Sequence, residues 1–286
     1  MREFYFIPFF YLINSRLKTK FELISWQIIF FIPVLIITYY HLDIRSNVFI
    51  HLFLLSQLIF YSIYEIGYIE NDVVTVKNEK DPTIRLNKEN TKYIEKNYSK
   101  IINSRYLVFL LSSILLLWID LWIEYVLNIE LFLFCVLITR LIFYVHNKIR
   151  NRFTIITFFL LSISKFSFPL ILFVNLEKIN YALFLALLVF PILRTIEIFF
   201  LRRFKFKFIG KIITDIDKFR IIYYLTLFIL FIMAYFLSVL NIYEFYIGIT
   251  IILYFLLFRI ICFFLIKGSI YKRDKKVKKK FQNKFK

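Results

Sequence analysis

Long hydrophobic runs alternate with short polar segments along the whole chain. Each run holds about 20 predominantly apolar residues, the length that an α-helix needs to cross the hydrocarbon core of a bilayer. A helix also satisfies its own backbone hydrogen bonds, as lipid requires. The predicted spans are residues 23–41, 47–69, 106–127, 129–146, 153–174, 179–201, 220–240 and 244–266. The pattern therefore predicts an all-α, polytopic transmembrane helix bundle of about eight spans.

The composition of the chain supports a membrane protein. Hydrophobic residues make up 60% of the 286 residues, and aromatic residues make up 21%. A soluble core cannot absorb so much apolar surface, whereas a lipid bilayer can. The expected location is the cell membrane, inner or plasma, with multiple passes. Pro33, Pro169 and Pro191 fall inside predicted spans, where we expect them to kink the helices.

The net charge of +19 lies in the polar segments and in the C-terminal tail. Segments rich in Lys and Arg alternate with segments nearly free of them, which predicts that both termini are cytoplasmic. Residues 1–266 are expected to form a single bundle, with cytoplasmic cap loops near 70–105 and 202–220. The basic tail, residues 267–286, is expected to lie disordered against the anionic leaflet. Because the charge follows the membrane topology, we do not expect nucleic acid as a partner.

The densest group of polar residues lies where the second predicted span ends, in residues 65–85. Asn71 and Asp72 offer adjacent oxygen ligands, and Glu79 lies seven residues beyond Asp72. Mg²⁺ takes one or two carboxylates together with diphosphate oxygens, so these three residues are a candidate metal site. Asp72 and Glu79 are also catalytic candidates. The alternative is an ordinary solvated loop of mixed charge.

A turn is predicted just after this group. Asp81, Pro82 and Thr83 are residue types typical of a turn, and this turn would bring Arg85 back towards Asp72. Arginine can bind phosphate through two parallel hydrogen bonds. Arg85 is therefore a catalytic candidate, and Asp81 and Thr83 are candidates for binding substrate.

A second polar group begins inside the sixth predicted span. Arg194 and Glu197 are three residues apart, which places them on one helix face. Charges inside a span are costly and are candidates for function, although these two could simply pair with each other. Asp215 and Asp217 could form a second acidic site, but their position before the next span favours N-cap and first-turn roles.

These motifs together resemble the UbiA superfamily of intramembrane prenyltransferases. The first motif of that family is Asn-Asp-x-x-Asp-x-x-x-Asp, followed by an Arg. Here Asn71 and Asp72 match its start, and Thr75 stands at the second Asp. Glu79 stands at the third Asp, and Arg85 follows. The resemblance implies a Mg²⁺-dependent enzyme with the metal held by Asn71, Asp72 and Glu79.

Further stretches are similar to the branch of this superfamily that transfers phosphoribosyl to polyprenyl phosphate. Residues 81–85 are similar to its Pro-Thr-x-Arg motif, and residues 193–197 resemble its Lys-Arg-Tyr-Ala-Glu. Tyr144 with Lys148, and Lys165 in the fifth span, stand where the family carries Tyr and basic residues. By this resemblance, the candidates for binding substrate also include Lys148, Lys165, Arg194 and Glu197.

Three hypotheses for the function follow. The first is a UbiA-type transferase that cleaves a diphosphate donor. It would transfer either phosphoribosyl from a soluble donor to an isoprenoid lipid, or a prenyl group from an isoprenoid lipid to a small acceptor. Phosphoribosyl transfer to polyprenyl phosphate is slightly preferred over prenyl transfer to an aromatic acceptor. The second is a lipid or solute transporter with a polar path along Asp120, Glu124, Arg140, Lys165 and Arg259. The third is a non-catalytic subunit of an envelope-polysaccharide assembly.

Overall fold

The computed structural model describes residues 2–41, 48–78, 84–123, 126–149, 151–174, 179–199 and 215–268. Every regular element in these ranges is helical, and eight helical stretches are long and apolar enough to span a membrane. They are Lys20–His41, Val48–Asn78, Tyr98–Asp120, Ile129–Lys148, Thr154–Ile171, Ile179–Phe199, Ile216–Phe236 and Ile242–Lys267. The predicted all-α class is confirmed, as is the predicted number of about eight helices long and apolar enough to span a membrane, although several of their bounds differ from the prediction. The cytoplasmic placement of the termini stays a prediction, as does the kind of membrane.

The chain packs into two compact units, residues 1–187 and residues 188–286. The boundary falls inside the sixth spanning stretch, where a π-helical turn, η4 (Leu188–Ile192), begins. Each unit has its own packed interior and its own polar cluster. A single bundle over residues 1–266 stays a prediction.

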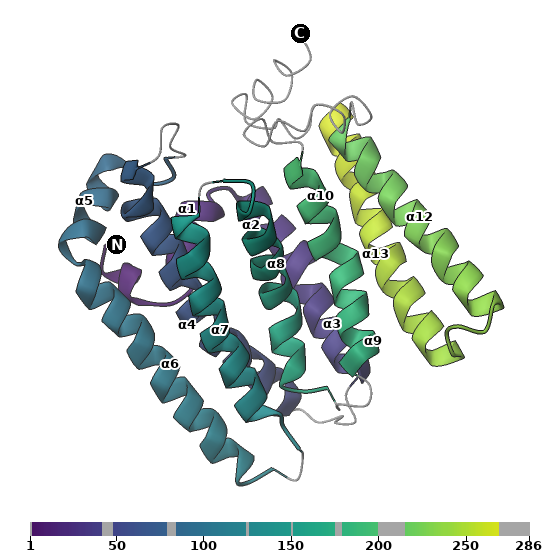
Figure 1. The fold of residues 1–286 in the computed structure, drawn as a ribbon, viewed down its shortest axis with the longest axis horizontal. Coiled ribbons are helices and arrows are strands. Elements are labelled where there is room, and N and C mark those ends of the chain that lie inside the picture. Colours follow the sequence, from purple (N-terminus) through teal and green to yellow (C-terminus); the bar gives the residue numbers. More distant parts are fainter. Residues whose placement is uncertain are drawn as a thin grey trace. The chain divides into compact units, whose positions relative to one another are not determined.

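The first unit is built around one long helix, α4 (Val48–Val73). The span that contains α4 has the largest buried share of the eight, 72% of its most apolar window. It packs against α6 (Tyr98–Asp120), α7 (Ile129–Lys148) and α8 (Thr154–Ile171), as Figure 1 shows. A helix that is apolar on all sides is stable when other helices or lipid cover it, and α4 is covered mainly by other helices. Helix α4 is therefore the centre of this unit.

The other elements of the first unit are short or broken by turns of a different helix type. They are η1 (Arg2–Phe6), α1 (Phe10–Arg16), α2 (Lys20–Trp26), η2 (Gln27–Phe31), α3 (Ile32–His41), η3 (Thr75–Asn78), α5 (Lys88–Lys96) and α9 (Ile179–Leu187). The first span consists of α2, η2 and α3 in succession. It starts at a capping box, in which the Thr19 hydroxyl accepts from the Glu22 N–H at 3.1 Å and Glu22 accepts from the Thr19 N–H at 2.9 Å.

Gly67 allows α4 and α7 to approach each other closely. A Cβ atom on Gly67 would lie 2.1 Å from Cγ of Phe143, far inside van der Waals contact. The Phe143 ring also meets Tyr64 and Tyr68 of α4, with ring centroids 4.6 and 5.6 Å away. One turn further along α7, Nδ2 of Asn147 donates to the Gly67 carbonyl at 3.1 Å. These contacts fix α7 against the polar end of α4.

Much of the connector predicted at residues 70–105 is helical. Helix α4 runs on to Val73, η3 and α5 follow, and α6 begins at Tyr98 rather than at residue 106. The Asn87 side chain caps α5 by accepting from the Asn90 N–H at 2.8 Å. Ile94 of α5 lies in a buried cluster with Tyr5, Tyr11, Ile69, Val73, Leu86 and Ile101. Helix α5 is stable because its apolar face finds this partner, which hydropathy alone did not indicate.

The second unit contains η4, α10 (Leu193–Phe199), α12 (Ile216–Phe236) and α13 (Ile242–Lys267). Helices α12 and α13 form a hairpin (Figure 1). Oδ1 of Asp215 accepts from the backbone N–H groups of Asp217 and Lys218, at 2.9 and 3.3 Å, which confirms the predicted N-cap of α12. A capping box of Asn241 and Glu244 starts α13.

Two of the three prolines predicted to kink spans coincide with π-helical turns. Turn η2 ends two residues before Pro33, and η4 contains Pro191. Proline lacks an N–H, and its ring clashes with the carbonyl four residues earlier. A π turn moves that carbonyl out of the regular ladder. Pro169 lies within α8.

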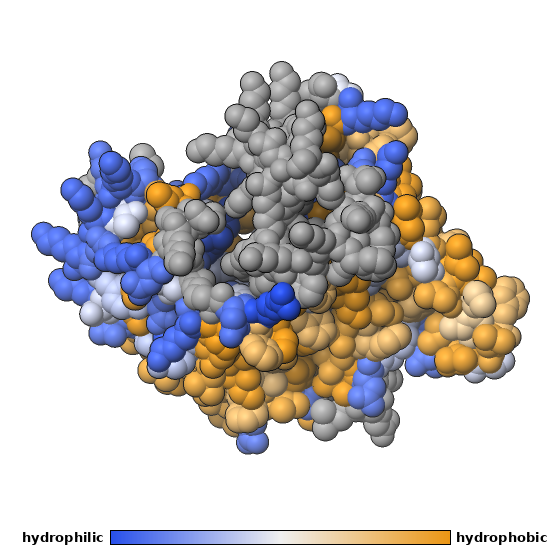
Figure 2. All heavy atoms as spheres, turned by 45° about the horizontal axis from the view of Figure 1, so that its top comes forward, coloured by the Kyte–Doolittle hydropathy of each residue, from blue (hydrophilic) through white to orange (hydrophobic). Residues whose placement is uncertain are grey.

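Hydrophilic residues gather at one end of the first unit. Figure 2 shows them over the region that carries α5 and the neighbouring helix ends, whereas hydrophobic residues cover the flanks of the long helices. Such a distribution is expected of helices that stand in a bilayer with one polar end in water.

Candidate functional site

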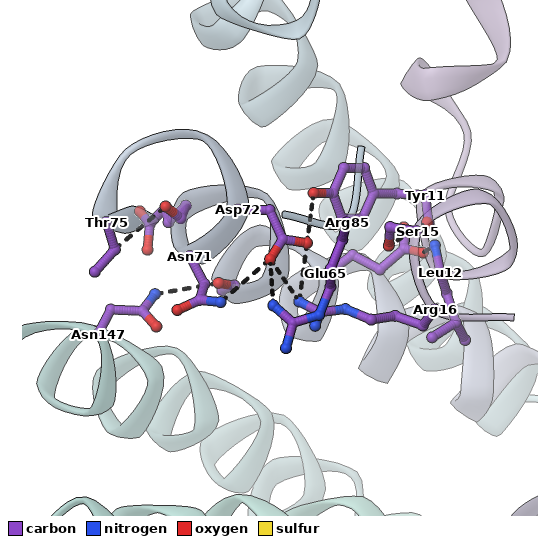
Figure 3. Close-up of polar contacts among 12 residues, drawn as sticks. Tyr11, Leu12, Ser15, Arg16, Glu65, Asn71, Asp72, Thr75, Arg85 and Asn147 are labelled. Carbon is purple, nitrogen blue, oxygen red and sulfur yellow. Dashed lines mark hydrogen bonds and ion pairs between the residues drawn. The ribbon is translucent and has the colours of Figure 1, made fainter. Parts of the chain in front are cut away.

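The Asp72 cluster consists of Tyr11, Arg16, Asn71, Asp72 and Arg85, at the end of α4 (Figure 3). Its centre is the carboxylate of Asp72, a residue that is only 6% exposed. Nη1 of Arg85 donates to Oδ1 at 2.8 Å, and Nη2 of Arg16 lies 3.1 Å from Oδ1 and 3.0 Å from Oδ2. The Tyr11 hydroxyl donates to Oδ2 at 2.9 Å, and Nδ2 of Asn71 donates to Oδ1 at 3.2 Å. Donors from three separate parts of the chain therefore hold both carboxylate oxygens.

The structure brings Arg85 back to Asp72, as the sequence predicted. The turn residues Asp81 and Thr83, and also Glu79, lie outside the described residues, so their roles stay predictions. Thr75, which stands at the second Asp of the family motif, donates to the backbone carbonyl of Glu70 at 3.3 Å. In Figure 3 it lies on the far side of Asn71 from the two arginines.

The N-terminal segment supplies two members of the Asp72 cluster. Helix α1 buries Tyr11 and Leu12, and Tyr11 belongs to the same apolar cluster as Ile94 of α5. The guanidinium carbon of Arg16 lies 4.3 Å from the centre of the Tyr68 ring on α4. This cation–π contact orients the arginine beside Asp72.

A fully buried ion pair lies two turns back along α4 from Asp72. Oε2 of Glu65 is 2.9 Å from Nη2 of Arg105, and neither side chain is exposed. Oε1 of Glu65 accepts from the backbone N–H of Leu12 at 2.7 Å, and Arg105 donates to the carbonyl of Tyr5 at 3.1 Å. The N-terminal backbone thus adds one hydrogen bond to each ion, which helps to offset the cost of burying the pair, while Nε and Nη1 of Arg105 are buried without an acceptor. The pair therefore fastens the N-terminal segment to α4 and α6.

The electrostatics of the Asp72 cluster are dominated by cations. Arg16 and Arg85 face one carboxylate, and Lys18 donates to the backbone carbonyl of Arg85. Burial and the charge of Asp72 raise the pKa of Tyr11 well above its usual range. The phenol is therefore protonated at physiological pH and serves as a donor to Asp72.

The described part of this cluster suits an anion better than a bare metal ion. The Arg85 side chain is 30% exposed and keeps further N–H donors, which match the oxygens of phosphate. Mg²⁺ needs several oxygen ligands directed at it, whereas the Asp72 oxygens already accept from arginines and a phenol. Within the residues that the structure describes, no three His, Cys, Asp or Glu side chains come together. The predicted metal set of Asn71, Asp72 and Glu79 stays a prediction.

Two lysines predicted to bind substrate lie against aromatic rings. Nζ of Lys148, at the end of α7, is 4.1 Å from the centre of the Tyr144 ring and also contacts its hydroxyl. Nζ of Lys165, in α8, is 4.4 Å from the centre of the Phe30 ring and 5.7 Å from that of Trp26. Their roles towards a substrate stay predictions.

The second unit contains the Glu197 cluster, which consists of Arg194, Glu197, Asp217 and Arg220. Glu197 is 4% exposed. Its Oε2 lies 2.5 Å from Nη1 of Arg194, and its Oε1 lies 2.5 Å from Nε of Arg220. Arg220 also contacts Asp217 at 3.0 Å. The pairing of Arg194 with Glu197, one of the two alternatives that the sequence left open, is present. A role of either residue towards a substrate stays a prediction.

The intramembrane charges of the transporter hypothesis lie in different settings. Arg140 forms an ion pair with Glu70, with Nη1 donating to Oε2 at 3.0 Å and Nη2 in contact with Oε1. Asp120 is the last residue of α6, and Glu124 lies outside the described residues. Arg259 is buried in α13. The ion pair with Glu70 gives Arg140 a structural role.

Sequence reasoning missed several residues that the structure places at or near the sites. They are Tyr11, Arg16, Glu65, Arg105 and Arg220. One signal was available for the buried pair, because an acid inside an apolar span demands a basic partner. Nothing in the pattern of residues indicated which of the many basic residues that partner would be.

Comparison of the chain with models of known protein families, with curated proteins and with solved structures gave no match.

Proposed function

We propose that the protein is an integral-membrane transferase of the UbiA type that binds a diphosphate-bearing donor at the Asp72 cluster. The observation that carries the proposal is the convergence of Arg16 and Arg85 on one nearly buried carboxylate at the polar end of the central spanning helix. Two guanidinium groups at one point offer the fork-shaped donors that phosphate oxygens accept from. Their position next to spanning helices gives a lipid substrate access from the bilayer.

The proposed reaction breaks the bond between the donor carbon and the diphosphate oxygen. The electron pair leaves with the diphosphate, whose developing charge Arg16 and Arg85 stabilise. An anionic phosphate oxygen of the acceptor lipid then bonds to the donor carbon with no proton to release, whereas an aromatic acceptor carbon bonds to it and loses its proton to water. Asp72 positions both arginines in the free protein, and Tyr11, which stays protonated, holds the carboxylate in place.

The proposed substrates are an isoprenoid lipid and a soluble donor or small acceptor. The similarity of residues 81–85 to the Pro-Thr-x-Arg motif favours phosphoribosyl diphosphate as donor and polyprenyl phosphate as acceptor. Prenyl transfer to an aromatic acceptor is the other branch of the same proposal. Mg²⁺ remains part of the proposal through Asn71, Asp72 and Glu79, and it would neutralise diphosphate charge when bound.

A transfer assay on the purified protein in lipid tests this proposal. Labelled phosphoribosyl diphosphate with polyprenyl phosphate, and a prenyl diphosphate with aromatic acceptors, are each incubated with and without Mg²⁺. We expect product from one pair, and we expect Asp72→Ala and Arg85→Gln to reduce it at least tenfold. The matched control is Arg152→Gln, at an exposed arginine between α7 and α8. No turnover with either pair, or equal turnover in all variants, would sink the proposal.

A further inference from the structure

The second unit contains a buried arginine that forms no salt bridge within the described residues. Arg259 of α13 is 8% exposed, and its Nε is buried without a hydrogen-bond acceptor. The ion pairs of this unit's described residues join Arg194 and Arg220 to Glu197, and Arg220 to Asp217. A guanidinium group stays charged in proteins, and a buried charge without a partner is strongly unfavourable.

Arg259 lies next to the Glu197 cluster. Tyr224 follows Arg220 by one turn of α12, and its ring stacks on that of Phe255, with centroids 5.3 Å apart and an interplanar angle of 4°. Phe255 precedes Arg259 by one turn of α13. Arg259 also hydrogen-bonds the Tyr224 hydroxyl and lies within electrostatic range of Arg220 and Glu197, while its Nε has no acceptor. Three guanidinium groups therefore share one region with two carboxylates.

The other acidic residues after residue 188 do not supply the missing charge. Asp215 is turned to the backbone N–H groups that start α12. Glu244 caps the start of α13, fifteen residues or about four turns from Arg259. Residues 200–214, which lie outside the described ranges, contain no Asp or Glu, and the tail beyond residue 268 contains only Asp274 among many lysines. The composition of this unit leaves a positive charge to be balanced.

We propose that Arg259, together with Arg220 and Arg194, binds the phosphate group of a lipid. A phosphate anion supplies the absent counter-charge, and its oxygens accept from guanidinium groups in pairs. Arg194 is the open side of the site, because its side chain is 46% exposed. Arg259 lies on the spanning helix α13, about two turns before its end at Lys267, so a lipid beside this helix has its headgroup near the site. This site is independent of the donor site proposed at Asp72.

The test is thermal unfolding of the full chain in neutral detergent with four additions. They are none, a phosphatidate, the matching diacylglycerol, and inorganic phosphate. We expect the phosphatidate to raise the unfolding temperature and the diacylglycerol to leave it unchanged. An equal rise with inorganic phosphate would assign the same site to a soluble phosphate group and would still support phosphate binding.

Variants of Arg259 give a result that a merely structural role would not. We expect Arg259→Gln to raise the unfolding temperature of the ligand-free protein, because it removes an unbalanced charge. The same variant should weaken binding of the phosphatidate at least tenfold, since a charge-assisted hydrogen bond is lost. Arg259→Lys should keep part of the binding.

Two controls separate this site from the Asp72 cluster. Arg152→Gln and Arg85→Gln should both respond to phosphatidate as the unchanged protein does. The proposal is overturned if Arg259→Gln binds the phosphatidate normally, if Arg85→Gln abolishes the response instead, or if neither phosphate compound shifts the unchanged protein. Loss of donor turnover in Arg85→Gln with normal phosphatidate binding would leave this proposal intact.

Discussion

The Asp72 and Glu197 clusters both surround one nearly buried carboxylate with arginines, but they are assembled differently. Arg16 and Arg85 are 56 and 13 residues away from Asp72 in sequence. Glu197 is paired with Arg194, one turn away on α10, and with Arg220 of α12, 23 residues away. The first cluster therefore depends on the docking of a distant segment, whereas the second joins residues that lie within 23 positions of Glu197.

The charge balance of the two clusters also differs. In the first unit, Glu65 and Glu70 each pair with one arginine of their own. The excess positive charge therefore lies around Asp72, where Arg16 and Arg85 share one carboxylate and Lys18 is close by. In the second unit, the remaining charge sits on Arg259, which is buried one turn beyond the aromatic stack. Two similar groups of arginines around a carboxylate therefore leave their unpaired N–H donors in different places. In the first unit these donors lie beside the docked N-terminal segment, and in the second they lie in the helix hairpin, on Arg259.

The largest expected effect is on the buried pair that docks the N-terminal segment. We expect Glu65→Gln to destabilise the protein by about 3–5 kcal/mol, because it leaves Arg105 charged and unpaired in an apolar interior. Unfolding in a denaturing detergent series measures this change. The double variant Glu65→Gln with Arg105→Gln should be less unstable than either single variant. Additive losses would show that the pair does not act as a unit.

The same pair gives a specific consequence for the site. Arg16 and Tyr11 reach Asp72 only while the segment fastened by Glu65 is docked. A folded Glu65 variant should therefore lose donor binding, yet keep phosphatidate binding at Arg259. Loss of both together would mean that the variant is simply unfolded.

A smaller loss is expected where α7 packs against α4. The Cβ of alanine at Gly67 would meet the Phe143 ring at 2.1 Å. We expect Gly67→Ala to cost about 1–3 kcal/mol from overpacking, measured by unfolding as above. Phe143→Leu should relieve part of this loss in the double variant. If Gly67→Ala is neutral alone, the close approach of the two helices is wrong.

The arginines of the two clusters should differ in their effect on the donor. Arg85→Gln should weaken donor binding about tenfold, equivalent to about 1.4 kcal/mol. Arg194→Gln in the other cluster should change donor affinity less than about twofold, because it does not belong to the donor site. Titration of donor binding on the folded variants measures both. Equal losses would mean that the clusters share one ligand.

The smallest effect is expected at Tyr11. Tyr11→Phe removes one hydrogen bond to Asp72 and retains the ring in its apolar cluster. Both arginines remain on the carboxylate, so we expect a loss of about 0.5–1.5 kcal/mol and a few-fold weaker donor binding. Tyr93→Phe, in a partly buried tyrosine packed against the same apolar cluster, is the control and should be neutral.

The eight spans and the return of Arg85 to Asp72 could be predicted because both are local properties. Hydropathy determines a span, and Arg85 is only 13 residues from Asp72 in sequence, after residue types that are typical of a turn. The positions of Arg16 and Tyr11 could not be predicted, because they depend on where a short helix docks against α4. The early start of α6 was missed for a related reason, since its first turns are polar and are stabilised by packing against η1 and α5.

Binding of inorganic diphosphate tests the central claim most directly, because it needs neither the acceptor nor turnover. Calorimetric titration of the full-length protein in lipid nanodiscs would compare the unchanged chain with Arg16→Gln, Arg85→Gln and the control Arg152→Gln. We predict saturable diphosphate binding that is weakened about tenfold by either cluster variant and is unchanged by the control. Binding that is absent from the unchanged protein, or equal in all four proteins, would contradict the assignment of the Asp72 cluster as a diphosphate site.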